Sequence, residues 1–228
     1  MYLKKKIIAL VPARGGSKEI KYKNLKKIKN KSLVEITSKF IDDLNITDYK
    51  VLNSDNKKIL NLGNKLDFIN IRRPKSLSGS KISDYQIINH SIKKLKKNNI
   101  RADYLIYLQP TSPKRNIKHL VKTLKKVIKK KLDGAWSVTK IDKKYHPLKV
   151  LRSNKGKIQL FSKKGKKVFA RQMLDDVFIR NGVFYIFSIN KLEIKKTIYL
   201  RNMILSECNY STVNIDTIAD LKYARKIL

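Results

Sequence analysis

Residues 6–24 read KIIALVPARGGSKEIKYKN and indicate more about the fold than any other part of this 228-residue chain. The apolar run at residues 7–11 has the length of a buried strand and is too short for a core helix. After Pro12 comes a loop with two glycines, a serine and three cations, namely Gly15, Gly16, Ser17, Arg14, Lys18 and Lys23. Adjacent glycines let the backbone approach a ligand closely, and Arg and Lys form charge-assisted hydrogen bonds with phosphate oxygens. The segment predicts a strand followed by a loop that binds a nucleotide triphosphate.

This loop matches neither of the two common phosphate-binding patterns. A P-loop needs four residues between its first Gly and a Gly-Lys-Ser/Thr, and the dinucleotide fingerprint needs G-x-G-x-x-G. The same residue types are also compatible with a basic surface turn after an N-terminal strand. The residue types alone leave both interpretations open.

Apolar runs alternate with helical patterns through the first two-thirds of the chain. We expect strands at 7–11, 50–53, 67–71, 104–108 and 135–138, and helices at 32–44, 57–66, 82–97 and 117–130. This alternation predicts a parallel sheet covered on both faces by helices. Ligands of such sheets bind at the carboxyl ends of the strands. The segments 12–24, 54–55 and 109–113 each follow a strand, so we expect them to converge on one crevice.

Composition restricts the class of protein. A single cysteine, Cys208, excludes an internal disulfide and is typical of a reducing compartment, where we expect it to be a small buried apolar residue. No stretch approaches the roughly 18 apolar residues of a membrane span, and the N-terminal segment lacks the small-residue cleavage site of a secretory signal. We therefore expect a cytoplasmic protein with no membrane span.

The chain is strongly basic, with 54 Lys and Arg against 17 Asp and Glu and a formal net charge of +37. Such a charge attracts polyanions. The lysines are nevertheless dispersed over the polar faces of expected helices, and no aromatic residues are interleaved with a basic patch as in nucleic-acid-binding modules. We expect nonspecific polyanion binding in vitro and no specific nucleic-acid partner.

Five segments resemble motifs of one enzyme family and occur in the order of that family. VPARGGSK followed by KN in the first loop resembles the nucleotide-binding signature of the acylneuraminate cytidylyltransferases, also called CMP-sialic acid synthetases. The other four segments are LQPTSP at 108–113, YHPLK at 145–149, RQ at 171–172 with NGVFYI at 181–186, and NIDT at 214–217 with DL at 220–221. Together they extend over nearly the whole chain.

The resemblance implies a three-layer α/β fold with a mostly parallel sheet, of the nucleotide-diphospho-sugar transferase-like (Rossmann-like) type, in a single domain of residues 1–228. It implies transfer of CMP from CTP to the anomeric hydroxyl of a nine-carbon 2-keto-3-deoxy (nonulosonic, sialic-type) acid, with release of pyrophosphate. The motifs do not separate sialic, legionaminic and pseudaminic acids. The eight-carbon acid Kdo ranks lower, because the related family that uses it lacks GGSK in its first loop.

The resemblance also implies roles for named residues. The residues expected to bind the nucleotide are Arg14, Gly15, Gly16, Ser17, Lys18, Lys23, Asn24 and Ser83. The residues expected to bind the acid sugar are Gln109, Lys149, Arg171, Asn181 and Tyr185. The residues expected at the reaction centre are Arg14, Lys18, Gln109 and Asp216. Without the motifs, each cation would be interpreted as one more solvated surface charge.

The expected cofactor is Mg²⁺, and here the sequence departs from the family. The family element is Asp-x-Asp, whereas this chain has Asn214 and Asp216. Because Mg²⁺ is commonly held by one or two carboxylates together with phosphate oxygens and waters, Asp216 can suffice, with the carbonyl oxygen of Asn214 beside it. We expect a higher magnesium requirement than is usual for the family. The alternative function is a catalytically weakened relative of the same fold that binds nucleotides or polyanions.

The pattern changes after residue 138. Strands at 149–152 and 157–161 flank a turn at 153–156 and predict a hairpin. The resemblance implies that residues 142–180 form an inserted arm that crosses into a partner subunit, so that a homodimer completes the sugar pocket. An ordinary surface hairpin is the alternative. A last helix is expected at 218–228, with Asp216 or Thr217 at its N-cap.

Overall fold

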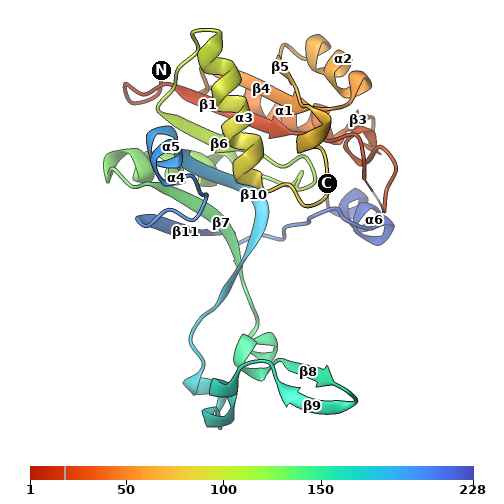
Figure 1. Cartoon of the computed structure of the whole chain (residues 1–228), viewed down its shortest axis with the longest axis vertical. Coiled ribbons are helices and arrows are strands. Elements are labelled where there is room, and N and C mark those ends of the chain that lie inside the picture. Colours follow the sequence, from red (N-terminus) through yellow and green to blue (C-terminus); the bar gives the residue numbers. More distant parts are fainter. Residues whose placement is uncertain (18) are drawn as a thin grey trace.

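A seven-stranded sheet forms the centre of the computed structural model, which describes residues 1–17 and 19–228 (Figure 1). The strand order is β11-β7-β10-β6-β1-β4-β5. The bounds are β1 Ile7–Pro12, β4 Tyr49–Ser54, β5 Ile69–Arg72, β6 Tyr104–Tyr107, β7 Gly134–Lys140, β10 Phe178–Ser188 and β11 Met203–Glu207. β10 is antiparallel to both of its neighbours, and the other pairings in this sheet are parallel. The predicted mostly parallel sheet is confirmed.

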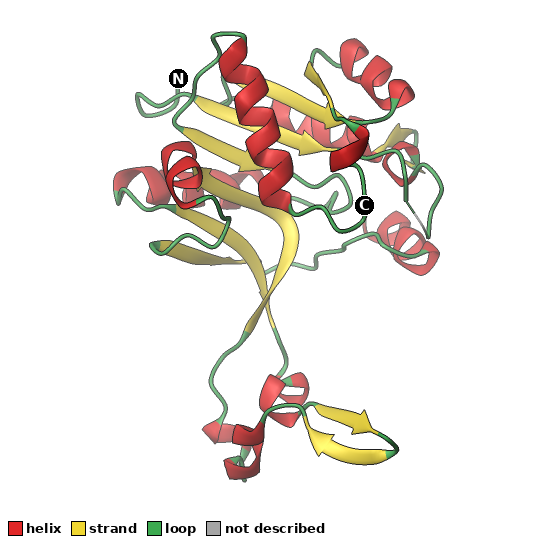
Figure 2. Cartoon of the chain, viewed as in Figure 1, coloured by secondary structure: helices red, strands yellow, loops and turns green. Residues whose placement is uncertain are grey.

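Helices cover both faces of the sheet, which gives three layers (Figure 2). α1 (Leu33–Leu44), α2 (Lys57–Lys65) and α4 (Ile117–Lys129) bury apolar residues in one cluster. α3 (Asp84–Lys97) and α5 (Ile189–Lys195) do so in the cluster on the other face. α1 begins with a capping box in which Ser32 and Glu35 satisfy each other's backbone N–H groups. The four helices expected from the sequence lie within two residues of their predicted bounds.

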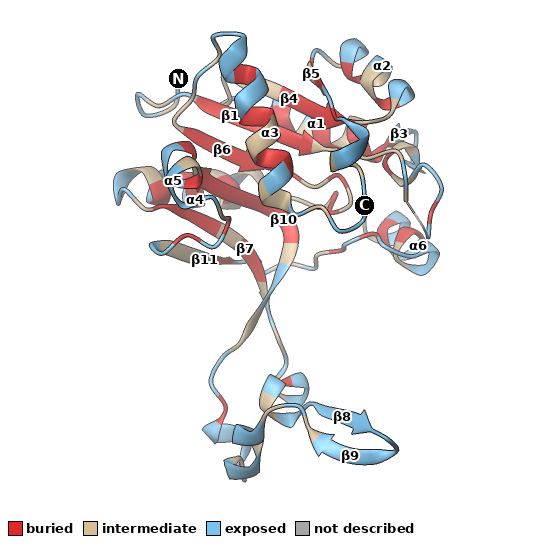
Figure 3. Cartoon of the chain, viewed as in Figure 1, coloured by how far each residue is buried: buried red, intermediate tan, exposed pale blue. Residues whose placement is uncertain are grey.

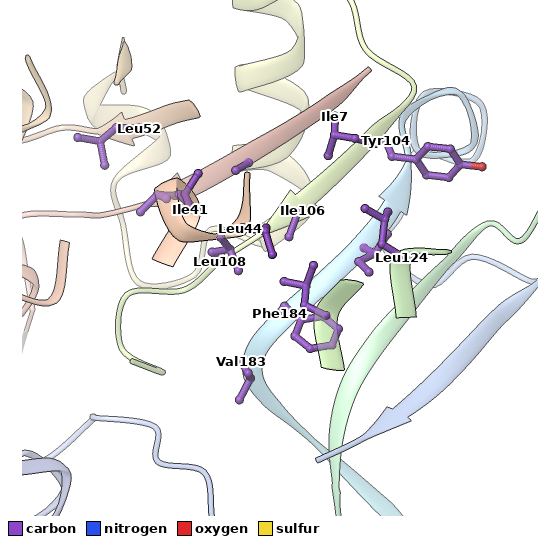
Figure 4. Close-up of a cluster of buried hydrophobic side chains, with 14 of the residues drawn as sticks. Ile7, Ile41, Leu44, Leu52, Tyr104, Ile106, Leu108, Leu124, Val183 and Phe184 are labelled. Atoms are coloured by element: carbon purple, nitrogen blue, oxygen red, sulfur yellow. The ribbon is translucent and has the colours of Figure 1, made fainter. Parts of the chain in front are cut away.

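The larger buried cluster joins distant parts of the chain (Figure 4). Phe184 of β10 packs in it with Ile106 of β6 and Leu124 of α4, and all three side chains are fully buried. The C-terminal third of the chain is thereby fixed to the strand–helix units of the first two-thirds.

Three elements of the C-terminal third were not predicted, namely β10, β11 and α5. β10 has no continuous apolar pattern, because Arg180, Asn181 and Gly182 interrupt it. Its pairing with β7 shifts register between Arg180 and Tyr185, and Gly182 has a φ of +73°. Such a bulge bends a strand and re-aims its side chains.

Residues 141–177, which we call the arm, project from the body between β7 and β10 (Figure 1). The arm carries the antiparallel hairpin of β8 (Leu151–Asn154) and β9 (Lys157–Leu160), as predicted from the sequence. Most of its residues are exposed in the single chain (Figure 3).

A third apolar cluster attaches the C-terminus to the first loop. α6 (Ile218–Ile227) packs beside the small hairpin of β2 (Lys27–Ile28) and β3 (Lys31–Ser32), with Leu221 and Ile28 buried between them. Thr217 caps α6 in a capping box with Asp220. Of the two N-cap candidates from the sequence, Asp216 and Thr217, the N-cap is therefore Thr217. This packing holds residues 213–216 near the first loop. None of the described helices is both long and apolar enough to cross a membrane.

Candidate nucleotide-binding site

A cavity of about 250 Å³ lies at the carboxyl ends of β1 and β6. The first loop, the segment after β5, the start of α3, the segment after β6 and residues 214–216 surround it. Its lining consists of Pro12, Arg14, Ser17, Lys23, Asn24, Arg73, Gly79, Ser80, Ile82, Asp84, Ile87, Tyr107, Gln109, Pro110, Thr111, Asn214 and Asp216. The crevice expected from the strand–helix alternation is therefore present, and seven of the site residues named from the sequence line it.

The two glycines of the first loop differ in their surroundings. The Gly15 N–H donates to the Asp55 carboxylate at 2.8 Å, and a Cβ at Gly15 would lie 2.6 Å from the Cβ of Asn56, which caps α2. A Cβ at Gly16 would meet nothing within 4 Å. Gly15 thus packs the loop against the end of α2, and neither glycine lines the cavity. Lys18 lies outside the described residues.

Two polar atoms at the cavity are buried without a hydrogen-bond partner among the described residues, Ser17 Oγ and Asn24 Oδ1. The other end of the Asn24 amide donates to the Arg14 carbonyl at 2.9 Å, which fixes the side chain. Buried polar atoms are almost always paired in folded proteins. Both residues line the cavity, so a ligand bound there is one source of the missing hydrogen-bond partners.

Three cations line the cavity: Arg14, Lys23 and Arg73. Arg73 is only 4% exposed, and its guanidinium donates to the side chain and the backbone carbonyl of Asn53 at 2.6 and 2.9 Å. Burial lowers the pKa of Arg73, and the positive charge of Arg14 lowers it further. Within the described part of the chain, no carboxylate lies within 4.0 Å of either arginine. Asp55 and Asp84 act in the opposite direction on the pKa of Arg73 but form no salt bridge with it. Two neighbouring cations without a salt-bridge partner favour an anionic ligand.

The segment after β6 forms the next wall, and Arg115 holds it in place. Arg115 donates to the backbone carbonyls of Gln109 at 2.5 Å and Val183 at 3.0 Å, and to the Thr37 hydroxyl at 3.3 Å. Burial of its side chain lowers the pKa of Arg115, a half-buried residue, to about 9. The Ile215 N–H donates to the Thr111 carbonyl at 2.8 Å, which ties residues 214–216 to this wall.

Asn214 and Asp216, the residues expected to hold a metal, lie together at the cavity. The Asn214 amide donates to Asp216 Oδ2 at 2.6 Å, and Lys23 Nζ lies 2.8 Å from Asp216 Oδ1. The Asn214 carbonyl oxygen accepts from Ser112 at 3.4 Å. Asn214 therefore presents its NH₂ group to the carboxylate in this arrangement. Among the described residues, no group of three His, Cys, Asp or Glu side chains is placed to hold a metal ion.

The oxygen donors present still fit a metal that binds together with a nucleotide. Asp216 is 61% exposed, and the cavity has a second carboxylate in Asp84. Mg²⁺ in nucleotide sites takes one or two carboxylates and completes its shell with phosphate oxygens and water.

The remaining predicted residues lie outside this cavity. Ser83 caps α3 through Gln86. The Asn181 side chain bonds to Ser137, Thr139 and the Val183 N–H. Tyr185 is 4% exposed, its hydroxyl accepts from the Gly182 N–H at 3.2 Å, and burial raises its pKa. Lys149 and Arg171 lie in the arm, where Arg171 is 3.6 Å from Asp142.

The lining residues that were not named as site residues from the sequence include Arg73, Asp84 and Tyr107. Arg73 directly follows β5, so it could have been predicted from the rule that ligands bind at the carboxyl ends of parallel strands. Tyr107 donates to Asp84 Oδ1 at 2.9 Å, and burial together with this carboxylate raises the pKa of Tyr107 well above its ordinary value. Nothing in the sequence marks Asp84, since an acidic residue in the first turn of a helix is common.

The fold and the phosphate-suited cavity together define an α/β protein of the nucleotidyltransferase type. A family model described as cytidylyltransferase matches residues 8–223, and the chain belongs to this cytidylyltransferase family. The more specific acylneuraminate subfamily is not distinguished by this match. No match is found among curated protein sequences.

Solved structures similar to this chain have the same fold at low sequence identity. A CMP:2-keto-3-deoxy-manno-octonic acid synthetase complexed with CTP has a TM-score of 0.72 at 16% identity, with 97% of this chain and 98% of that chain covered. A 4-diphosphocytidyl-2C-methyl-D-erythritol synthase has a TM-score of 0.70 at 12% identity, with 99% of each chain covered. The corresponding synthase from Anaerococcus prevotii has a TM-score of 0.62 at 14% identity, with 98% and 96% covered. The nucleotide-diphospho-sugar transferase-like fold is thereby confirmed.

Gly182 connects β10 to the wall formed after β6, and its replacement tests this arrangement. Its φ of +73° is unfavourable for other residues, and a Cβ would lie 2.7 Å from both Gln109 Oε1 and Ser112 Oγ. We expect Gly182→Ala to lower the free energy of unfolding by at least about 1 kcal/mol in urea denaturation. Gly16→Ala, where a Cβ meets nothing within 4 Å, is the matched control. Equal stability of the two variants would contradict the argument.

Proposed function

We propose that this chain transfers CMP from CTP to the anomeric hydroxyl of a nonulosonic (sialic-type) acid and releases pyrophosphate. One observation carries the proposal. In a chain of the cytidylyltransferase family, three cations and two unpartnered buried polar atoms line a single cavity at the carboxyl edge of the sheet.

The proposed reaction is a direct displacement at phosphorus. The acceptor oxygen attacks the α-phosphorus, the bond from that phosphorus to the bridging oxygen breaks, and pyrophosphate leaves with the electron pair. The acceptor hydroxyl loses its proton to water or a base. Such chemistry depends on position and on neutralised charge more than on a covalent enzyme intermediate. Arg14 and Lys23 are the side chains we assign to the phosphates, and Ser17 and Asn24 those we assign to the nucleoside hydroxyls.

We assign Mg²⁺ to Asp216, with Asn214 beside it. When bound, the ion would neutralise phosphate charge and polarise the reacting phosphoryl group. Because Lys23 is paired with Asp216 in the single chain, a nucleotide phosphate would give Lys23 a new partner and free the carboxylate.

The choice of a nine-carbon acid follows from the resemblance of residues 12–24, 108–113 and 181–186 to the acylneuraminate family. The eight-carbon acid is the nearest competitor, since the similar structure with a TM-score of 0.72 is a synthetase for that class of sugar acid. A cytoplasmic site of action stays a prediction of the composition.

The decisive experiment is pyrophosphate release with CTP, Mg²⁺ and a panel of nonulosonic acids that also contains the eight-carbon acid. We expect one nine-carbon acid to support release and Arg14→Ala to lower the rate by about 100-fold, since donors at developing charge are worth this much. Arg101→Ala is the control, because Arg101 is exposed and precedes β6 at the opposite edge of the sheet. Release with the eight-carbon acid alone would replace the proposed acceptor, and no release at high Mg²⁺ would contradict the enzyme function.

Asn214→Asp tests the metal assignment and the alternative of a weakened relative. The change restores a second carboxylate and removes the N–H···O contact to Asp216. We expect Mn²⁺, measured by electron paramagnetic resonance in the absence of nucleotide, to bind about tenfold more tightly. Asn190→Asp, an exposed residue of α5, controls for the added charge. Equal Mn²⁺ affinity in the two variants would exclude Asn214 from the metal site.

We further propose that a second copy of this chain covers the arm and that the protein is a homodimer. Ile158, Phe161 and Phe169, all in the arm, are 79%, 63% and 85% exposed in the single chain. Several large exposed apolar side chains in one segment indicate an interaction surface. The arm also holds Lys149 and Arg171, which lie outside the cavity of their own chain and are available to the site of a partner.

We expect Ile158→Asp with Phe169→Asp to convert a dimer into a monomer in light scattering at micromolar concentrations, because two buried charges destabilise an apolar interface. Ile194→Asp, at a 60% exposed apolar residue of α5, should leave the mass unchanged. A wild-type protein that is already monomeric would refute the dimer.

A further inference from the structure

A second hollow of about 420 Å³ lies directly beside the nucleotide cavity. The two share Ile82 and Asp84 at the start of α3. The second hollow is lined further by Ser83, Arg180, Lys196 and Tyr199. None of these four residues lines the first cavity.

Arg180 is held in this hollow by two aromatic rings. Its guanidinium carbon lies 5.0 Å from the centre of the Trp136 ring and 5.5 Å from that of the Tyr199 ring. The two rings meet edge to face at 5.1 Å. Ring contacts engage the faces of a guanidinium, whereas its five N–H donors point outward in its plane. Within the described residues, no carboxylate lies within 4.0 Å of Arg180.

The bulge in β10 determines where Arg180 lies. Arg180 pairs with Val138 near the carboxyl end of β7, and the register shifts immediately after it. Two residues later, Gly182 lies against Gln109 and Ser112 of the wall that borders the nucleotide cavity. The bulge therefore places Arg180 on the same edge of the sheet as the nucleotide loop.

The hollow suits a ligand with one compact anionic group and several hydroxyls. Arg180 and Lys196 supply two positive charges, and Asp84, on the shared wall, is the one carboxylate among the described lining residues. A guanidinium binds the two oxygens of a carboxylate with parallel hydrogen bonds. Ser83 adds a hydroxyl that donates or accepts.

We propose that this second hollow binds the acceptor of the reaction, and that Arg180 binds the carboxylate of that acceptor and so selects a sugar acid. The inference rests on the proposed function and assigns the carboxylate of the acceptor to Arg180, a residue that the sequence did not suggest. A shared wall is what the transfer requires, because the acceptor oxygen must reach the α-phosphorus without leaving the protein. Of the body residues first assigned to the sugar, Asn181 and Tyr185 already have partners inside the protein, and Gln109 lines the first cavity.

The test is calorimetric titration of acceptors into the full chain, with and without Mg²⁺ and a non-hydrolysable CTP analogue. The probes are N-acetylneuraminic acid, legionaminic acid, pseudaminic acid, the eight-carbon acid, the methyl ester of each acid that binds, and glucose 1-phosphate. We expect at least one acid to bind wild type, and its methyl ester and the Arg180→Ala variant each to weaken binding by about 10- to 100-fold, as for the loss of a charged hydrogen-bonded pair. Arg180→Lys should recover part of the loss, and Arg101→Ala should bind as wild type does.

Different results would contradict the role of Arg180 and the proposed function. Three outcomes would each overturn the role of Arg180. The first is unchanged acid affinity in Arg180→Ala, and the second is an ester that binds as well as its acid. The third is glucose 1-phosphate binding that depends on Arg180 while no acid binds. Failure of wild type to bind the CTP analogue would overturn the proposed function, whereas Arg180-dependent acid binding without nucleotide would still support the second hollow. Because Arg180 is exposed, the variants should fold, and an unchanged melting temperature verifies this.

Discussion

The guanidinium group of Arg115 makes the hydrogen bonds on which the geometry of the site depends. It bonds to the segment after β6, to the bulge of β10 and to α1, which are distant in sequence. No carboxylate within the described part of the chain lies within 4.0 Å of it, so its buried charge is compensated by carbonyl and hydroxyl dipoles. A buried charge is tolerated only when its hydrogen bonds are well made. The positions of Gln109 and Val183 are therefore fixed by the hydrogen bonds of Arg115, and Gln109 lines the first cavity.

Charge, more than apolar burial, distinguishes the nucleotide cavity from the rest of the surface. The net charge of +37 is spread over the chain and by itself indicates no particular ligand. What singles out this edge of the sheet is that Arg14 and Arg73 lie near each other with no described carboxylate in salt-bridge range, while Ser17 and Asn24 leave buried polar atoms unpaired. Each of these features costs free energy in the absence of a ligand. An anionic ligand with hydroxyl groups offsets all of them together.

The features that could be predicted from the sequence are those that depend on a local pattern of residues. Residues 7–11, 50–53 and 104–108 were identified as strands because each is a short run of buried residues, and the loops after them converge because parallel strands share a carboxyl edge. β10 was missed because its bulge breaks the alternation at Arg180 to Gly182, and the bulge lies against Gln109 and Ser112, which are far away in sequence. Arg180 was missed for the same reason. Nothing near it in the sequence indicates that the rings of Trp136 and Tyr199 both lie against it.

The contact between Lys23 and Asp216 connects a residue that we assign to the phosphates with the residue that we assign to the metal. Both side chains line the cavity, and in the single chain they neutralise each other at 2.8 Å. Asn214 strengthens this closed arrangement, because its amide donates to the other oxygen of the same carboxylate. An aspartate at 214 would instead repel Asp216 and favour a cation between them. With asparagine, the carboxylate is satisfied without a metal, so a metal gains little from binding before the nucleotide. If phosphate oxygens attracted Lys23, the carboxylate would lose one of its two partners and would be free to hold a divalent ion. Under the proposed function, asparagine at 214 would thus favour an order of binding in which the nucleotide comes first and the metal with it.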